Sequence, residues 1–286
     1  MFSFVYNRDM GRFLLKSSVI FFLLFFAVLP AWSKASGGLD IAGLQAQAKG
    51  MTEGERIAFF ADQFLGVPYD TDPLGLYVTR RVIVADDRID CMYLVFRSAE
   101  IALSSTPRGA EQLALYMRFK TKGRLGPDGR VLNYGDRFQY GLDMILSGKW
   151  GRNITRFLGK TIPVETSSRF QKMGVDTVMV LPRREIGSAI SSSKFRSGDI
   201  VFFVKDPAKR AALEVIGHMG ILEVENGDVY LIHAHGLKKT SRNPDVKPGA
   251  VTKVLFKDYV KAMPFIGIMV TRIQGDRQQA ARHKVM

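Results

Sequence analysis

One cysteine and three of the four histidines of this 286-residue chain have types and positions that suit nucleophilic chemistry. Cys91 is the only cysteine, so it is a core residue, half of an intermolecular bridge or a reactive nucleophile. Cysteine catalysis also needs a histidine that exchanges protons with the thiol and a third group that orients this histidine. His218, His233 and His235 are candidates for those two roles.

Cys91 lies where a helix is expected to begin. Asp90 is a favourable N-cap residue, and the apolar sequence after it predicts a helix over residues 91–103. Unpaired backbone N–H groups and the helix dipole at this end predict a lowered thiol pKa. Three charged neighbours, Asp87, Arg88 and Asp90, argue against a core position. The sequence therefore favours a nucleophile over the other two roles.

The three histidines are expected on one β-hairpin. Asn226-Gly227 is typical of a two-residue turn between antiparallel strands. With this turn, His218 faces His235, and His233 lies one diagonal step away. Residues 233 and 235 are two apart on one strand, so their side chains point to the same face. The hairpin thus predicts three imidazoles on one patch of sheet.

A zinc site is the alternative interpretation of these imidazoles. His233 and His235 could be two ligands, with His218 or Cys91 as a third. No further cysteine or carboxylate stands at ligand spacing, so we expect no metal and no other cofactor.

Helical patterns dominate the first half of the chain. Residues 52–55 (TEGE) predict a capping box for a helix that ends at Gly66. Further helices are expected over about 107–120 and 133–148, and residues 77–85 (YVTRRVIVA) resemble a strand.

Short apolar segments separated by turns begin at Val175. They predict strands over residues 178–181, 200–204, 218–224, 229–233 and 267–273. This segregation predicts an α+β fold, in which N-terminal helices carrying Cys91 pack on a C-terminal antiparallel sheet carrying the histidines.

The N-terminus has the three parts of a secretory signal peptide in residues 1–35. Arg8, Arg12 and Lys16 precede a 13-residue apolar run, which small residues follow. A retained anchor is the alternative, but spanning a bilayer takes about 20 apolar residues. We expect export to the periplasm or cell envelope, with membrane contact only through this segment if it stays uncleaved.

The rest of the chain is expected to form one domain. With 47% hydrophobic residues it can bury a sizeable core, which excludes disordered, collagen-like and disulfide-stapled proteins. Residues 36–50 predict a flexible lead-in, residues 51–275 a catalytic domain with a helical insertion at about 105–175, and residues 276–286 a frayed tail.

The charge points to an anionic partner. Removing residues 1–35 takes away four basic residues and one acid, so the net charge falls from +14 to +11. A membrane surface, a nucleic acid or an acidic polymer would suit this charge, and a solvated surface without a partner is the alternative. No recognised nucleic-acid motif is present, and export also argues against a nucleic acid.

Five short segments occur in the order typical of NlpC-type papain-like peptidoglycan hydrolases. They are residues 65–69 (LGVPY), 90–91 (DC), 197–203 (SGDIVFF), 217–221 (GHMGI) and 232–234 (IHA). The chain resembles this superfamily. The long insertion and the fifteen-residue step between two of the histidines are closer to its N-acetylmuramoyl-L-alanine amidase-like branch.

The resemblance implies a papain-like fold with a β half-barrel and an exported cysteine hydrolase that cleaves an amide bond of peptidoglycan through a thioester. By position, it implies Cys91 as the nucleophile, His218 as the general base and His233 as the group that orients it. It also places Tyr69 beside the thiol and Asp90 on the substrate side.

Two residues leave alternatives open. His235 could replace His233 as the third member or lie on the substrate side, and Met92 stands where the family usually has Ser or Thr. An NlpC-type stem-peptide endopeptidase, a non-catalytic cell-wall binding module and a thiol acyltransferase are the other functions that this scaffold could have.

Overall fold

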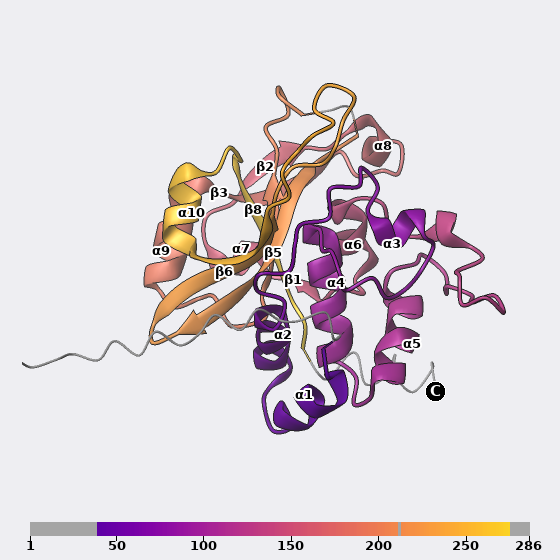
Figure 1. The fold of residues 1–286 in the computed structure, drawn as a ribbon. Coiled ribbons are helices and arrows are strands. Elements are labelled where there is room, and N and C mark those ends of the chain that lie inside the picture. The colour runs from indigo at the N-terminus through magenta and orange to yellow at the C-terminus, as the bar shows by residue number, and fades with distance from the viewer. Residues whose placement is uncertain (1–38, 211–212, 275–286) are drawn as a thin grey trace, which may run out of the picture. The chain divides into compact units, whose positions relative to one another are not determined.

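The computed structural model describes residues 39–210 and 213–274, and an antiparallel sheet of eight strands lies at its centre (Figure 1). The strands pair in the order β2-β3-β8-β4-β5-β6-β7, and β1 pairs with β8. Their bounds are β1 Arg152–Asn153, β2 Ile162–Glu165, β3 Thr177–Pro182, β4 Ile200–Val204, β5 Ile216–Glu225, β6 Asp228–His235, β7 Ala250–Leu255 and β8 Gly267–Arg272.

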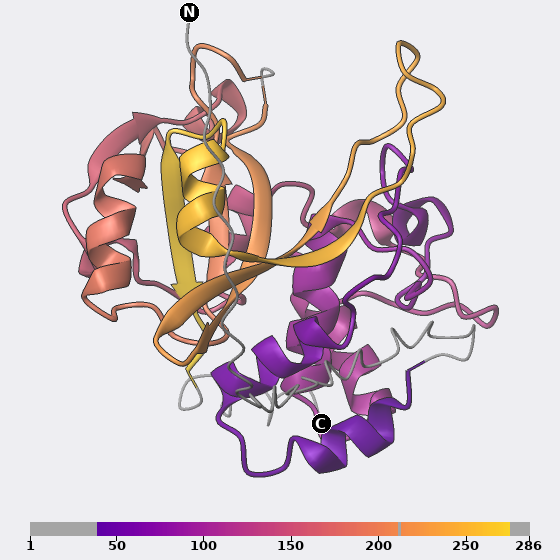
Figure 2. The same ribbon diagram turned by 60° about the vertical axis from the view of Figure 1, so that its left-hand side comes forward.

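Helices cover both faces of the sheet. Those from α1 to α6 lie on one face, and α9 and α10 lie on the other (Figures 1 and 2). The helices of the described residues are α1 Ile41–Gln47, α2 Glu53–Asp62, α3 Leu76–Thr79, α4 Cys91–Ala102, α5 Pro107–Met117, the 3-10 helix η1 Tyr134–Asp136, α6 Gly141–Ser147, α7 Thr155–Leu158, α8 Ser168–Gln171, α9 Arg183–Ser191 and α10 Phe256–Ala262.

The sheet separates two hydrophobic cores. Ile221 and Ile232 pack into the core shared with the N-terminal helices, whereas their neighbours Leu222 and Leu231 pack into the core shared with α9 and α10. Successive strand residues point to opposite faces, so the strands from β3 to β8 contribute to both cores. For this reason all five residues of β4 are buried, and its sequence is a continuous apolar run.

The expected α+β layout is confirmed in outline, and several elements match closely. Thr52 and Glu55 form the predicted capping box at the start of α2. The predicted helix over residues 91–103 is α4, and the five predicted strands correspond to β3, β4, β5, β6 and β8.

The prediction of a strand over residues 77–85 is wrong. These residues form α3 and a turn in which Arg81 has a φ of 57°. Tyr77 and Ile83 are buried in the helical core. The Ile83 carbonyl accepts a hydrogen bond of 2.8 Å from the Arg118 side chain rather than from a neighbouring strand. β-branched residues thus reflect burial here, not strand pairing.

The predicted lead-in and insertion also differ from the structure. Residues 41–47 form α1, which Asp40 caps and whose Gln45 side chain donates to the Ile101 and Ser104 carbonyls. The helix expected over 133–148 is divided into η1 and α6, and residues 105–175, expected to be helical, also contain strands β1 and β2 of the sheet. Strand β7 was not predicted either.

The predicted signal segment and tail lie outside the described residues. None of the helices in residues 39–210 and 213–274 is long and apolar enough to span a membrane.

A buried ion pair joins α4 to α5. The Arg118 guanidinium donates to both carboxylate oxygens of Glu100, at 2.6 and 2.5 Å, and the two side chains are 2% and 0% exposed. Removing one partner of such a pair leaves a buried charge without compensation. The pair therefore fixes how the two helices pack.

We expect Arg118→Met to lower the free energy of unfolding by about 3–5 kcal/mol in urea denaturation, because Glu100 would lose its partner. Arg130→Met is the control. Its ion pair with Asp128 is largely exposed, so we expect a change of at most about 0.5 kcal/mol. Equal losses in the two variants would show that the buried pair has no special role.

Candidate active site

The thiol lies at the start of α4. Asp90 is the N-cap, as predicted, and its Oδ1 accepts a hydrogen bond of 2.8 Å from the Tyr93 backbone N–H. Cys91 is the first helical residue and is half-buried, while the ten residues from Tyr93 to Ala102 are all buried. Only the first turn of this helix is therefore partly accessible.

The hairpin of β5 and β6 has the predicted register. Asn226 and Gly227 have φ values of 51° and 86°, as a type I′ turn requires. The strands pair from Glu225↔Asp228 to Ile221↔Ile232. This register brings the three histidines to one end of the hairpin.

His218 and His233 form a hydrogen-bonded pair. The distance between His218 Nε2 and His233 Nδ1 is 2.8 Å. His218 therefore bonds to the diagonal histidine rather than to His235, which it was expected to face. His233 is 2% exposed, whereas His235 is exposed, with its ring centroid 5.8 Å from that of His233.

Aromatic rings enclose the histidine pair. Phe203 stacks on His218 with ring centroids 5.6 Å apart, and the Tyr259 ring lies 5.0 Å from that of His233. Burial, together with the neighbouring imidazoles, lowers the pKa of His218 to about 3 and that of His233 to about 4. Both imidazoles are therefore neutral at pH 7.

The lowered thiol pKa expected from the helix start is not found. Burial, followed by the charge of Asp90, raises the pKa of Cys91 to about 12. Lys238 and a hydrogen bond from the Met219 backbone act in the opposite direction without outweighing burial. The resting site thus holds a neutral thiol and neutral imidazoles.

Two tyrosines and one strand connect the thiol to the histidines. The Met219 backbone contacts the thiol, and Met219 directly follows His218 in β5. Burial and then the Cys91 charge raise the pKa of Tyr259, whose ring also contacts the His233 ring. Tyr69, expected beside the thiol, has its pKa raised by the same two causes. All these groups therefore lie around one end of β5.

Lys238 is a neighbour of the thiol that sequence analysis missed. Its Nζ lies 2.9 Å from Asp90 Oδ2 and 5.4 Å from the centroid of the Tyr69 ring. Asp90 thus caps α4 with one oxygen and binds Lys238 with the other. No motif marks Lys238 or Tyr259, because each reaches the site only through the packing of α10 and of the segment between β6 and β7. Phe203 ends the 197–203 segment, but that segment gave no sign that its ring would stack on His218.

In the described part of the chain, no group of three or more His, Cys, Asp or Glu side chains is arranged to hold a metal ion.

We expect Lys238→Met to slow alkylation of Cys91 by iodoacetamide roughly three- to tenfold at pH 8, because the cation that favours the thiolate is lost. Cys91 is the only cysteine, so mass spectrometry of the intact protein measures its modification directly. Lys239→Met is the matched control, since its side chain is exposed and only its backbone N–H binds Thr71. Equal rates in the two variants would contradict this role for Lys238.

The histidine pKa values also predict how stability depends on pH. A histidine whose pKa falls on folding binds its proton more tightly in the unfolded chain, so the free energy of unfolding decreases as pH falls below about 6.5. In chemical denaturation between pH 6 and pH 4, we expect His218→Gln to reduce this slope by up to about 1.4 kcal/mol per pH unit. The exposed His235→Gln control should stay close to the wild-type slope. An unchanged slope in His218→Gln would be evidence against the lowered pKa.

Comparison with known proteins finds similarity only at the level of structure. No protein-family model matches the chain, and no curated protein matches its sequence. A solved N-acetylmuramoyl-L-alanine amidase from Bacteroides uniformis ATCC 8492 is 20% identical with a TM-score of 0.58, and the match covers 78% of this chain and 99% of the amidase.

Two further solved structures have similar coverage. A Legionella pneumophila protein of the DUF1460 family is 16% identical with a TM-score of 0.58, over 82% of this chain and 93% of its own. A putative xylanase from Bacteroides fragilis is 19% identical with a TM-score of 0.51, over 75% and 99%. The chain therefore has an amidase-like fold, shared with these bacterial proteins.

Proposed function

We propose that this chain is an exported cysteine hydrolase with an NlpC-type papain-like fold, which cleaves an amide bond of bacterial peptidoglycan. The observation that carries the proposal is the partly buried His218–His233 hydrogen bond beside the helix start that bears Cys91. The structural similarity to the Bacteroides uniformis N-acetylmuramoyl-L-alanine amidase supports the choice of bond and polymer.

In the proposed mechanism, Cys91 is the nucleophile and His218 the general base. Nε2 of His218 is occupied by His233, so Nδ1 is the ring nitrogen left to exchange protons with the thiol. Because the pKa values leave both groups neutral, the proton moves from Sγ to Nδ1 as sulfur attacks the carbonyl. A preformed thiolate–imidazolium pair is not required.

His233 is the orienting group in this proposal. With His218 protonated at Nε2, this N–H donates to His233 Nδ1 and holds the ring in the tautomer that a base requires. The same bond stabilises the imidazolium that forms during attack. His235 is exposed, and its ring lies 5.8 Å from that of His233, whereas the His218 and His233 rings lie 5.0 Å apart. This difference favours His233 over His235 for the orienting role.

The remaining steps follow from the same residues. Backbone N–H groups at the start of α4 stabilise the oxyanion of the tetrahedral intermediate. His218 then protonates the leaving amine, which departs as the thioester forms on Cys91. Water attacks the thioester, gives its proton to His218 and releases the carboxylic acid, and the thiol regains its proton.

Tyr69 and Asp90 support the substrate side in different ways. The charge of Cys91 raises the pKa of Tyr69, so the two residues are neighbours, and in this proposal the Tyr69 hydroxyl contacts a bound peptide. Both Asp90 oxygens are engaged, by the Tyr93 N–H and by Lys238, so Asp90 shapes the site through these contacts. Export to the periplasm or cell envelope, directed by the signal peptide in residues 1–35 that is then cleaved, completes the proposal.

Digestion of purified peptidoglycan, with products analysed by mass spectrometry, tests the activity. We expect wild type to release products and Cys91→Ala to release none, because the thioester cannot form. His218→Ala should lower kcat/KM by about 10³-fold or more, whereas His235→Gln should stay within about threefold.

The product masses also separate the possible functions. Intact stem peptides released from muramic acid indicate an amidase, shortened stems an endopeptidase, and amine adducts an acyltransferase. Co-sedimentation with peptidoglycan that yields no products and is unaffected by Cys91→Ala would indicate a binding module. If Cys91→Ala releases the same products as wild type, the catalytic proposal is wrong.

A further inference from the structure

The segment between β6 and β7, residues 236–249, forms a projecting arm that we call the basic arm. Figure 2 shows it extending away from the two strands. It carries four cations and a single acid, which are Lys238, Lys239, Arg242, Lys247 and Asp245. The side chains of Lys239, Arg242 and Lys247 are exposed, as is Leu237 at 63%.

The outer cations of the basic arm have no ion-pair partner among the residues that the structure describes. Lys238 pairs with Asp90, but Lys239, Arg242 and Lys247 form no ion pair with any residue in the described ranges. Three like charges on one exposed segment repel each other and contribute nothing to packing. Their charge is therefore available to an anionic ligand.

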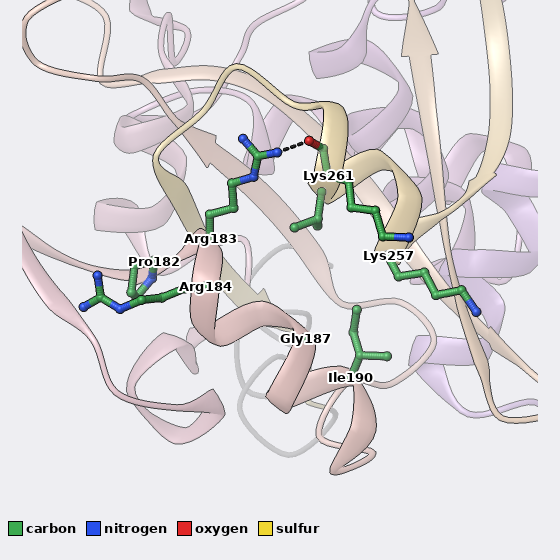
Figure 3. A pocket seen from close by; sticks show the side chains of 8 residues that line it. Pro182, Arg183, Arg184, Gly187, Ile190, Lys257 and Lys261 are labelled. Carbon is green, nitrogen blue, oxygen red and sulfur yellow. Dashed lines mark hydrogen bonds between the residues drawn. The ribbon is translucent and has the colours of Figure 1, made fainter.

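The groove between α9 and α10 is a second basic surface, but its cations have partners. It has a volume of about 740 Å³ and is also rich in cations (Figure 3). Each cation already has a partner within the fold. Arg183 donates to the Lys261 and Met263 carbonyls, Arg184 lies 3.9 Å from Glu185, Lys257 lies 3.7 Å from Asp228 and Lys261 lies 2.8 Å from Asp258. Local acids thus compensate much of the groove's charge.

Both ends of the basic arm, where it joins β6 and β7, are bonded to residues of the candidate active site or next to it. Lys238 bonds to Asp90 next to Cys91, and the Lys239 N–H donates to the Thr71 carbonyl at 2.8 Å. At the other end of the arm, the Tyr69 N–H donates to the Gly249 carbonyl, also at 2.8 Å. A polymer bound along the arm would therefore lie close to the thiol.

We propose that the basic arm docks the peptidoglycan strand by binding the free carboxylates of its stem peptides through Lys239, Arg242 and Lys247. The inference rests on the proposed function for its choice of polymer. Individual exposed charge pairs are weak, so the arm gains affinity by contacting several carboxylates at once. Because such contacts are screened, binding should weaken as salt increases.

Co-sedimentation with purified peptidoglycan tests this, with Cys91→Ala as the background so that the polymer stays intact. We expect the triple variant Lys239→Gln, Arg242→Gln, Lys247→Gln to bind about tenfold more weakly at 20 mM NaCl and to lose most of its salt dependence. The groove variant Arg184→Gln, Lys257→Gln, Lys261→Gln removes the same charge and should bind within about twofold of the background protein. Thermal unfolding checks that both variants are folded.

A second arm of the experiment tests the ligand chemistry. Peptidoglycan whose carboxylates are converted to neutral amides with carbodiimide and ethanolamine should bind the background protein as weakly as the native polymer binds the arm variant. Binding that amidation leaves unchanged would overturn the choice of carboxylates. Equal losses in the arm and groove variants, or no loss in the arm variant, would overturn the docking role.

These outcomes are independent of turnover. If wild type cleaves no peptidoglycan but binding still depends on the arm and on carboxylates, the proposed hydrolase fails and the docking surface stands. If wild type cleaves peptidoglycan and the arm variant binds and cleaves as wild type does, only the docking proposal fails.

Discussion

The burial of α4 on nearly every side is the constraint on which the arrangement of this protein depends. Ten of its twelve residues are buried, and these include the charged residues Arg97 and Glu100. Buried charges must be paired, so Arg97 binds Asp86 and Glu100 binds Arg118. These pairs draw α5 and the preceding loop around the helix, and they leave only its first turn at the surface. The position of the thiol follows from the packing of the whole helix.

Burial also sets the protonation state of the groups in the candidate active site. Burial raises the pKa of Cys91 and lowers the pKa of His218 and His233, so the resting groups are neutral. Catalysis by such a site depends on close placement of donor and acceptor rather than on a stored ion pair. The register between β4 and β5 shifts next to the residue pair Phe203↔His218. Such irregularities change the direction of neighbouring side chains.

Two surfaces of this molecule carry positive charge, and they differ in whether the cations have partners. In the groove between α9 and α10, acids and backbone carbonyls compensate the cations, and Arg183 joins the two helices. In the basic arm, three cations lack partners among the described residues, and the fourth is bound to the helix cap beside the thiol. Net charge alone does not distinguish the two surfaces, because partners such as Met263 for Arg183 and Asp228 for Lys257 come from distant parts of the chain.

Local patterns in the sequence were sufficient for the parts of the fold that depend on neighbouring residues. The Asp90 cap, the Thr52–Glu55 capping box and the Asn226-Gly227 turn each involve residues within a few positions of one another. The alternation of the hairpin was enough to place three histidines at one end. The ordered segments also pointed to the amidase-like fold that the structural comparison supports.

Tertiary structure decided what depends on contacts between distant residues. Residues 77–85 resemble a strand, but burial against α4 and the Arg118 bond to Ile83 give them another conformation. The choice of His233 as the hydrogen-bond partner of His218, and the arrival of Lys238 and Tyr259 at the thiol, likewise follow from packing. The direction of the thiol pKa shift was decided in the same way. The helix start is a local feature that favours the anion, whereas desolvation comes from all the surrounding elements and outweighs it.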